Sequence, residues 1–257
     1  MSSTIAALTS AAKADREYDI AAERIQQALL TVKVPAIAGL ELGVRAEPAR
    51  LVGGDYIDIF CRDGCLLFGL GDASGKSLGA AVNALMLRYL LRGLTAALGH
   101  GQIEAIVRHT NSVVSEDLHE TDYFITLIMG TLDPRSGHLR LVNAGHEPAM
   151  VLREGAADVQ VMTRHGIVLG VDRQTNFPLE ETTLGIGDRA VFYTDGLTEA
   201  TNTRGELFTA ECLRENVVAH RDLSPQALAD ELFETVKAYS DGQIRDDATV
   251  FVVRRTA

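Results

Sequence analysis

Cysteine is scarce in this chain of 257 residues, which has only three. Cys61, Cys65 and Cys212 form no CxxC motif and cannot all pair, so the sequence does not describe a disulfide-stabilised scaffold and suits a reducing compartment. Zinc-type patterns such as HExxH or HxH are also missing. We therefore expect a cytoplasmic protein that does not use zinc.

Positive charge and long apolar runs are also lacking. Lys and Arg total 24 against 35 Asp and Glu, a net charge of −11, which argues against a nucleic-acid partner. The longest apolar region, 80–98, is interrupted by Arg88 and Arg92 and is too short between charges to span a bilayer. The first residues show no basic region followed by an apolar core, so no signal peptide is expected. These features predict no membrane partner.

What is present indicates a globular domain, because 46% of the residues are hydrophobic and 23% are charged. Helical periodicity occurs in 15–30, 77–98, 102–118 and from Ser224 onward. Strand-like runs lie at 40–46, 56–60, 65–70, 124–133, 138–145, 148–154, 189–195 and 248–255. We interpret the three runs from 124 to 154 as an antiparallel meander. Strands in runs and helices in pairs predict an α+β fold with antiparallel sheets. We expect one domain at 39–257, preceded by a helical lead-in at 1–38.

The stretch "CLLFGLGDASGKSLGAA", residues 65–81, resembles a phosphate-binding loop but departs from it. A P-loop needs glycine five residues before Gly75, where this chain has Leu70. Asp72 would also place a carboxylate inside the anion site, where it would repel phosphate. We therefore reject the P-loop interpretation, and Asp72 needs another explanation.

Acidic residues recur at the ends of apolar strand-like runs. Asp55, Asp72, Asp195 and the pair Asp246–Asp247 all lie in such positions, several of them beside glycine. A single strand-end Asp is usually a turn former, but carboxylates gathered without a counter-charge would cost several kcal/mol each. A cation removes that cost. An all-oxygen ligand set favours Mg²⁺ or Mn²⁺, and two ions sharing one carboxylate can activate water against a phosphoryl group.

Six collinear motifs identify a resemblance. "VGGDYID", "GLGDASGKSLGAA", "FITLIMGTLDPRSGHLRLVNAGHEPAMVL", "GIVLGV", "YTDGLTEATN" and "RDDATVFVVRR" are similar to the metal-dependent protein phosphatases (PPM family), and within them to the bacterial SpoIIE/RsbU-like branch. The resemblance covers about residues 40–255. It implies a four-layer α-β-β-α sandwich with two antiparallel sheets. It also implies a serine/threonine protein phosphatase that uses two Mn²⁺ or Mg²⁺ ions, with a third conceivable, and forms no phosphoenzyme.

The resemblance also implies a set of site residues. Asp55 and Asp72 would be the central catalytic ligands, Asp72 bridging both ions, and the carbonyl of Ala73, Asp195 and Asp246 would complete the metal site. Asp247 and Gly54 would support the ligands without binding metal. Arg50 is either an exposed edge arginine, which we favour, or the phosphate-binding arginine found at this offset in eukaryotic relatives.

Two departures from the family pattern limit the prediction. Eukaryotic relatives have Gly-His after the bridging Asp, whereas this chain has Ala73-Ser74, so the proton donor is undefined and metal-bound water is the default. His146 in "NAGHEP" is interpreted as part of a turn, and neither Ser74 nor Ser77 as a nucleophile. The lead-in reads "IQQALLTVKVP" where relatives read "Q..LLP", and either receives an activating partner or only completes the core.

Three functions remain in competition. The first is a phosphatase acting on a phosphorylated STAS-domain anti-anti-sigma regulator, as the resemblance implies. The second is a pseudophosphatase that binds a partner without turnover, although a binding module has no reason to keep every Asp. The third is a nucleotide-handling enzyme, suggested by Gly75-Lys76-Ser77 or by the similarity of Gly53-Gly54-Asp55 to the Gly-Gly-acid turn of nucleotide cyclases. In this chain, however, the acid–aromatic pair expected after that turn is missing.

Overall fold

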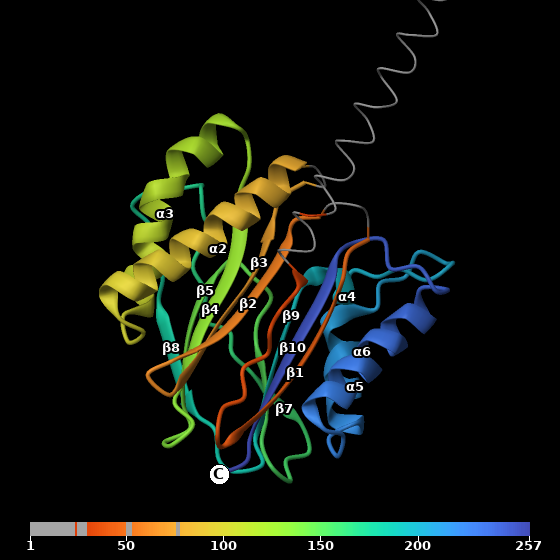
Figure 1. The fold of residues 1–257 in the computed structure, drawn as a ribbon. Helices are drawn as coiled ribbons and strands as arrows, with labels where there is room; N and C mark the ends of the chain where they lie inside the picture. The colour runs from red at the N-terminus through yellow and green to blue at the C-terminus, as the bar shows by residue number, and fades with distance from the viewer. Residues whose placement is uncertain (1–23, 25–29, 50–52, 76–77) are drawn as a thin grey trace, which may run out of the picture.

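Two antiparallel sheets form the centre of the computed structural model, which describes residues 24, 30–49, 53–75 and 78–257 (Figure 1). Within these residues each sheet has five strands. The first, sheet A, has the order β1 (Leu40–Glu47), β10 (Ala248–Arg255), β9 (Arg189–Tyr193), β6 (Met150–Leu152) and β7 (Val159–Val161). The second, sheet B, has the order β2 (Asp55–Arg62), β3 (Cys65–Ala73), β4 (Ile125–Leu132), β5 (His138–Ala144) and β8 (Leu179–Thr183).

Helices cover both outer faces of this sandwich. On one side, α2 (Leu78–Leu98) and α3 (Ile103–Glu120) pack on sheet B. On the other, α5 (Thr209–Ala219) and α6 (Pro225–Tyr239) pack on sheet A, with the short α4 (Asp195–Thr198) following β9. The prediction of an α+β fold with four layers, α-β-β-α, is confirmed (Figure 1).

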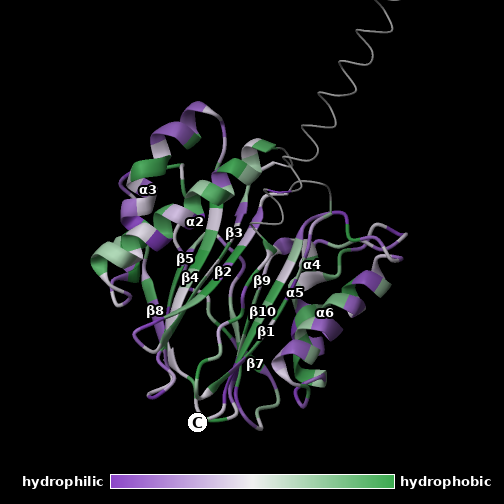
Figure 2. Cartoon of the chain, in the orientation of Figure 1, coloured by the Kyte–Doolittle hydropathy of each residue, from purple (hydrophilic) through white to green (hydrophobic). Residues whose placement is uncertain are grey.

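Apolar side chains between the sheets hold the sandwich together. Phe68 of sheet B lies with its ring centroid 4.5 Å from that of Phe192 and 5.3 Å from that of Phe251, both of sheet A. All three are buried, and such aromatic contacts contribute about 0.5–1.5 kcal/mol each beyond area burial. Figure 2 shows hydrophobic residues concentrated on the central strands. The sheets are therefore fixed relative to each other by a packed core.

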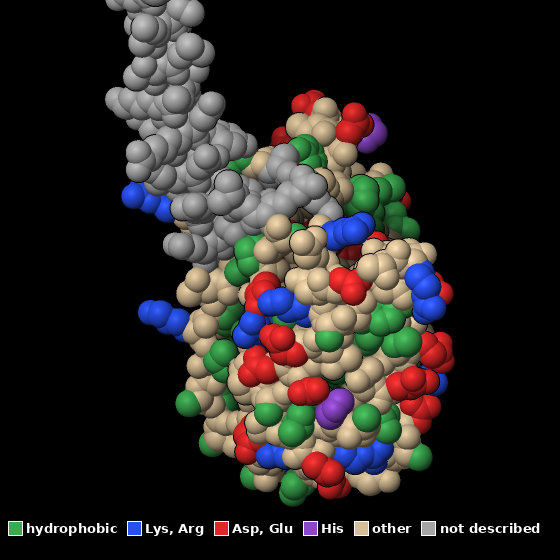
Figure 3. All heavy atoms as spheres, turned by 90° about the vertical axis from the view of Figure 1, so that its right-hand side faces the viewer, with side chains coloured by type: hydrophobic (Ala, Val, Ile, Leu, Met, Phe, Trp, Pro, Cys, Tyr) green, Lys and Arg blue, Asp and Glu red, His purple; other side chains and the backbone are tan. Residues whose placement is uncertain are grey.

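The outer helices follow their sequence signals. Ala80, Ala81 and Ala84 are fully buried on the face of α2 that packs on sheet B, because small side chains allow close approach of the helix. Ser224 caps α6 by accepting the backbone N–H of Ala227, and Pro225 occupies the first turn. The face that carries α5 and α6 shows acidic and basic side chains interspersed (Figure 3). This is the ordinary exterior of an amphipathic helical layer.

The meander expected over residues 124–154 is wrong in its last strand. β4 and β5 do pair as a hairpin, but β6 leaves sheet B and pairs with β9 and β7 in sheet A. The "NAGHEP" turn makes this crossover, with Gly145 at φ +66° and the Asn143 side chain bonded to the backbone of His146. Alternation of apolar residues identifies a strand but does not say which sheet it joins. The short strands β7 and β8, and α5, gave no clear signal in the sequence.

The expected boundary at residue 38 stays a prediction, and most of the lead-in lies outside the described residues. β1 begins at Leu40, directly after Gly39 at φ +85°. Ile37 is buried in the core between the sheets, with Val32 packed against it. No helix in the described part of the chain has the length and apolar character needed to span a membrane.

Candidate active site

Asp55 and Asp72 face each other across two neighbouring strands. Asp55 is the first residue of β2, Asp72 is the last but one of β3, and the register pairs their Cα positions directly. Residues opposite each other in an antiparallel pair project to the same face, with Cβ atoms about 4.5–5.5 Å apart. Two carboxylates at that separation repel each other strongly. The sheet register alone therefore creates an acidic pair at this end of the sandwich.

Two threonine hydroxyls hold Asp55 from the other sheet. Thr194, which follows β9, donates to Asp55 Oδ2 at 2.8 Å, and Thr249 of β10 donates to the same oxygen at 2.7 Å. Burial raises the pKa of Asp55 well above its usual value, and the charges of Asp72 and then Asp247 raise it further, against the two hydroxyl bonds. Asp55 is thus oriented by hydrogen bonds, and the charges that act on it among the described residues are those of Asp72 and Asp247.

The two glycines before Asp55 make this packing possible. A Cβ on Gly54 would lie 2.2 Å from the carbonyl oxygen of Ala73 and 2.5 Å from Asp72 Oδ1. A Cβ on Gly53 would lie 1.5 Å from Asp247 Oδ2. The backbone of residues 53–54 therefore lies directly against two carboxylates and a carbonyl oxygen, which only glycine permits. The Ala73 carbonyl oxygen and the Asp72 carboxylate therefore both lie against Gly54.

Asp247 is buried and ties the strand-β10 end to the segment before β2. Its Oδ1 accepts the backbone N–H of Ala49 at 2.9 Å, and the backbone N–H groups of Asp55 and Gly54 also bond to it. Burial raises the pKa of Asp247 despite these bonds, and the neighbouring Asp246 raises it as well. With its oxygens engaged by backbone donors, Asp247 fixes Ala49 and the start of β2 at Gly54 and Asp55.

Asp72 and Asp195 line one small cavity of about 40 Å³, together with Thr126, Gly145, His146 and Glu147. Asp195 begins α4, at the end of β9. Thr126 connects the two halves: its hydroxyl accepts the backbone N–H of Asp72 at 3.2 Å and lies 2.9 Å from His146 Nδ1. Burial raises the pKa of Glu147, and the nearby Asp195 raises it further. The cavity is therefore walled by acidic groups from both sheets.

Asp246 lines a different and larger cavity, beside Ala49. Its Oδ1 accepts the backbone N–H of Asp247 at 3.0 Å, which links it to the carboxylate group around Asp55. The structure gives Asp247, rather than Asp246, the close electrostatic relation with Asp55. Arg50, Lys76 and Ser77 lie outside the described residues.

The donor set fits hard divalent cations. It consists of carboxylates and a carbonyl oxygen. Burial raises the pKa of Asp55 and of Asp247, and the charges of Asp72 and Asp247 raise the pKa of Asp55 further, an effect that a bound cation would oppose. Among the described residues, no three His, Cys, Asp or Glu side chains converge closely enough to form a preformed metal site. Mutual repulsion opposes such convergence, and a cation would remove that repulsion. The assignment of Asp55, Asp72, Ala73, Asp195 and Asp246 as ligands stays a prediction.

Sequence reasoning missed several supporting residues. Thr249 and Thr126 lie inside apolar strands, where a threonine reads as an ordinary β-branched residue. Thr194 directly precedes Asp195, yet its hydroxyl bonds Asp55 and does not cap α4. Glu147 follows His146 directly, and only the crossover turn brings it to the cavity. The sequence did offer one signal. A threonine lies next to an aspartate both in Thr194-Asp195, directly after β9, and in the segment from Asp246 to Thr249, which leads into β10.

Known structures share this architecture. The fold is similar to the SiaA-PP2C domain of Pseudomonas aeruginosa, with a TM-score of 0.80 and 20% identity over 95% of this chain and 98% of that one. It is also similar to the catalytic domain of the serine/threonine phosphatase PstP in complex with two manganese ions, with a TM-score of 0.63 and 18% identity over 85% of this chain and 99% of that one. Fold and acidic centre together define the class of the PP2C-type protein phosphatases.

The family is shown by the sequence comparison. The family model of Stage II sporulation protein E (SpoIIE) matches residues 62–256, and the chain belongs to this family. The match includes Asp72, Asp195 and Asp246, and it begins after Asp55. The phosphoserine phosphatase RsbU of Bacillus subtilis is 27% identical over 93% of this chain and 70% of its own length. Protein IcfG of Synechocystis is 28% identical over 90% of this chain, which spans only 40% of IcfG.

Proposed function

We propose that this chain hydrolyses phosphoserine or phosphothreonine on a partner protein with Mn²⁺ or Mg²⁺. The observation that carries the proposal is the direct cross-strand pairing of Asp55 with Asp72, with Asp247 adding to the same field. Bringing buried carboxylates together is costly, and a cation bound there would offset that cost. Membership in the SpoIIE family and the likeness to manganese-containing PstP support the same conclusion.

The ligands proposed are Asp55, Asp72, the carbonyl of Ala73, Asp195 and Asp246. Bound Mn²⁺ or Mg²⁺ would neutralise phosphoryl oxygens and lower the pKa of an attacking water. The protein's own contribution is orientation. Thr194 and Thr249 occupy Oδ2 of Asp55 and fix its rotamer, while Thr126 holds the backbone at Asp72. Rigid carboxylates are needed because ligand positions must be correct within about 0.5 Å.

A nucleotide-handling function receives no support. The P-loop interpretation needs a turn beginning at residue 70, but Leu70 lies inside β3, fully buried, and pairs with Ile57 and Ile128 on either side. A pseudophosphatase remains the second candidate. It is disfavoured because the described part of the chain keeps the close glycine packing around Asp72 and Asp247, which a binding surface does not require.

The substrate proposed is a phosphorylated STAS-domain anti-anti-sigma regulator of a partner-switching pathway. The support is the likeness to the phosphoserine phosphatase RsbU. We propose also that an activating partner binds the lead-in at 1–38, most of which lies outside the described residues. Arg50 stays a candidate phosphate-binding residue on the same footing.

The test is hydrolysis of p-nitrophenyl phosphate and of a phosphoserine protein in Mn²⁺, Mg²⁺ or EDTA. We expect activity in either metal, none in EDTA, and a loss of at least about a hundredfold in Asp72→Ala and Asp195→Ala. Asp63→Ala is the matched control, because Asp63 lies on the exposed turn between β2 and β3 and should keep full activity. A folded protein that binds Mn²⁺ but hydrolyses no phosphoprotein would indicate the pseudophosphatase instead.

A further inference from the structure

A cavity of about 520 Å³ lies beside Asp246, between the end of β1 and the loop that joins α6 to β10. Its volume is within the range of about 300–1,000 Å³ typical of ligand sites. The lining residues are Glu47, Pro48, Ala49, Phe233, Lys237, Gly242, Gln243, Ile244, Arg245 and Asp246. Only Asp246 among them belongs to the proposed metal ligands, so most of this cavity has no role in the chemistry proposed above.

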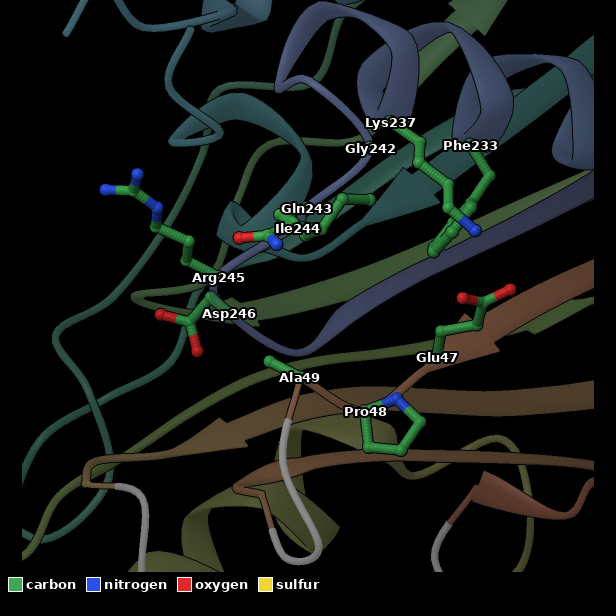
Figure 4. A pocket seen from close by; sticks show the side chains of 10 residues that line it. All are labelled: Glu47, Pro48, Ala49, Phe233, Lys237, Gly242, Gln243, Ile244, Arg245 and Asp246. Carbon is green, nitrogen blue, oxygen red and sulfur yellow. The ribbon is translucent and has the colours of Figure 1, made fainter. Parts of the chain in front are cut away.

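The cavity has two ends of different character. Figure 4 shows Lys237 and Phe233 reaching down from α6 at one end, opposite Glu47 and Pro48, whereas Asp246 lies at the other end. Ile244 and Ala49 lie between them (Figure 4). A chain that enters at Asp246 and follows the cavity therefore passes apolar side chains and then meets the Lys237 ammonium group.

One wall of the cavity is fixed to the acidic centre. Ala49, which lines the cavity, donates its backbone N–H to Asp247 Oδ1 at 2.9 Å, and Asp247 in turn adjoins Asp55. The position of Ala49 in the cavity wall therefore depends on Asp247, the same carboxylate that holds the backbone at the start of β2. A ligand in the cavity would be held in a constant register relative to the proposed metal site.

The end of the cavity away from Asp246 carries two charged side chains, Glu47 and Lys237. Glu47 already forms an ion pair with Arg45 of the same strand. The side-chain ammonium group of Lys237 makes no hydrogen bond or ion pair with the rest of the described chain, and the residue is half-buried. A lysine in the last turn of a helix is also favoured by the helix dipole, which accounts for its place in α6 but not for its direction into the cavity.

We propose that this cavity receives the residues flanking the phosphorylated serine of the substrate protein and selects an acidic side chain at Lys237. This inference rests on the proposed phosphatase function. The occupant must be continuous with the phosphoryl group, because the cavity opens beside Asp246. It must present a carboxylate, because the Lys237 ammonium group supplies a cation at the far end of the cavity. A phosphoserine segment with Asp or Glu a few residues away meets both conditions.

The experiment uses two fluorescent phosphoserine peptides that differ only in the flanking residues, Asp and Glu in one, Lys and Arg in the other. Binding is measured by fluorescence anisotropy and hydrolysis as kcat/KM in Mn²⁺, with p-nitrophenyl phosphate as the reference substrate for every variant. A single ion pair in a half-exposed position is worth up to about 1 kcal/mol, so we expect a preference of about threefold to fivefold for the acidic peptide.

Two variants and a control test the role of Lys237. Lys237→Met keeps the apolar stem and should abolish the preference, and Lys237→Glu should reverse it, each relative to its own rate on p-nitrophenyl phosphate. Lys33→Met is the matched control, since Lys33 is exposed and lines a different cavity, beside Asp58. Thermal unfolding verifies that each variant is folded.

The outcomes separate this inference from the proposed function. Hydrolysis of both peptides with no charge preference, unchanged in Lys237→Glu, overturns the inference and leaves the phosphatase intact. Binding of the acidic peptide that depends on Lys237, without hydrolysis of any substrate, supports the cavity assignment and overturns the phosphatase proposal.

Discussion

Gly54→Ala is the substitution that most directly tests the geometry of the acidic centre. The new methyl group would lie 2.2 Å from the Ala73 carbonyl oxygen and 2.5 Å from Asp72 Oδ1, whereas ordinary contact begins at 3.4 Å. The first of these atoms belongs to the backbone of β3 and cannot rotate away. The strands β2 and β3 must therefore separate by about 1 Å at this end, a shift several times larger than the ±0.2 Å that metal–ligand distances tolerate.

The expected consequences are measured by calorimetric titration with Mn²⁺ and by urea unfolding in EDTA. Manganese affinity should fall by about tenfold to a hundredfold, the range seen when groups that orient metal ligands are lost. Stability without metal should fall by about 1–3 kcal/mol, as for other overpacked sites. Phosphatase activity at limiting Mn²⁺ should fall in parallel with affinity.

Gly93→Ala is the matched control, because its Cβ would meet nothing within 4 Å and it lies inside α2. There alanine should stabilise the protein by about 0.5–1 kcal/mol and leave manganese binding unchanged. If Gly54→Ala binds manganese as tightly as the unmodified protein, Asp72 and the Ala73 carbonyl are not joint ligands, and our interpretation of the glycine packing is wrong.

Three further substitutions probe other parts of the structure. Asp55→Asn should raise the unfolding temperature in EDTA at pH 8, because the raised pKa of Asp55 makes its charge destabilising there. The same variant should lose most of the roughly 2.7 kcal/mol of stability that Mn²⁺ gives the unmodified protein at 100 times Kd. If Mn²⁺ stabilised the variant as much as the unmodified protein, this reasoning would be refuted. Burial lowers the pKa of His146 to about 4, below its value in the unfolded chain. The contribution of His146 to the free energy of unfolding is therefore complete above about pH 6.5 and declines by about 2–3 kcal/mol by pH 4.5. His146→Gln should flatten that decline in urea unfolding at the two pH values, and an equal slope would count against it. Asp58→Asn removes the buried carboxylate that accepts bonds of 2.6 and 2.7 Å from Arg92, and the free energy of unfolding should fall by about 2–3 kcal/mol. Asp63→Asn, at an exposed position, should lower it by under about 0.5 kcal/mol.

The strand ends that carry the acidic residues could be predicted from the sequence, because apolar runs that stop at Gly and Asp are local signals. Asp55, Asp72 and Asp195 all lie where such a run ends or begins. Their convergence could not be derived from those runs. It depends on β2 pairing with β3 in one sheet and on β9 pairing with β10 in the other, and no local pattern encodes that arrangement.

The residues that serve the ligands were harder to predict for the same reason. Thr249 reaches Asp55 across 194 positions of sequence, and Thr194 reaches it across 139. The expectation that Asp247 supports the ligands stays a prediction, and its bond to the Ala49 backbone could not be read from the sequence. The "NAGHEP" segment was correctly interpreted as a turn, whereas its role in moving the chain between sheets was not foreseen.

The pairing of β1 with β10 joins residues 40–47 to residues 248–255, and this has a consequence for biosynthesis. Asp55 and Asp72 belong to the β2–β3 hairpin, which can form early, while Thr249 and the neighbouring aspartates arrive with β10, and Thr249 lies 194 positions after Asp55. Such long-range pairing is slow to form, so a nascent chain carries an incomplete and electrostatically strained centre until β10 docks. Phosphatase activity would then appear in one step when β10 docks. The point during synthesis at which activity is first measured would therefore show when the two sheets have assembled.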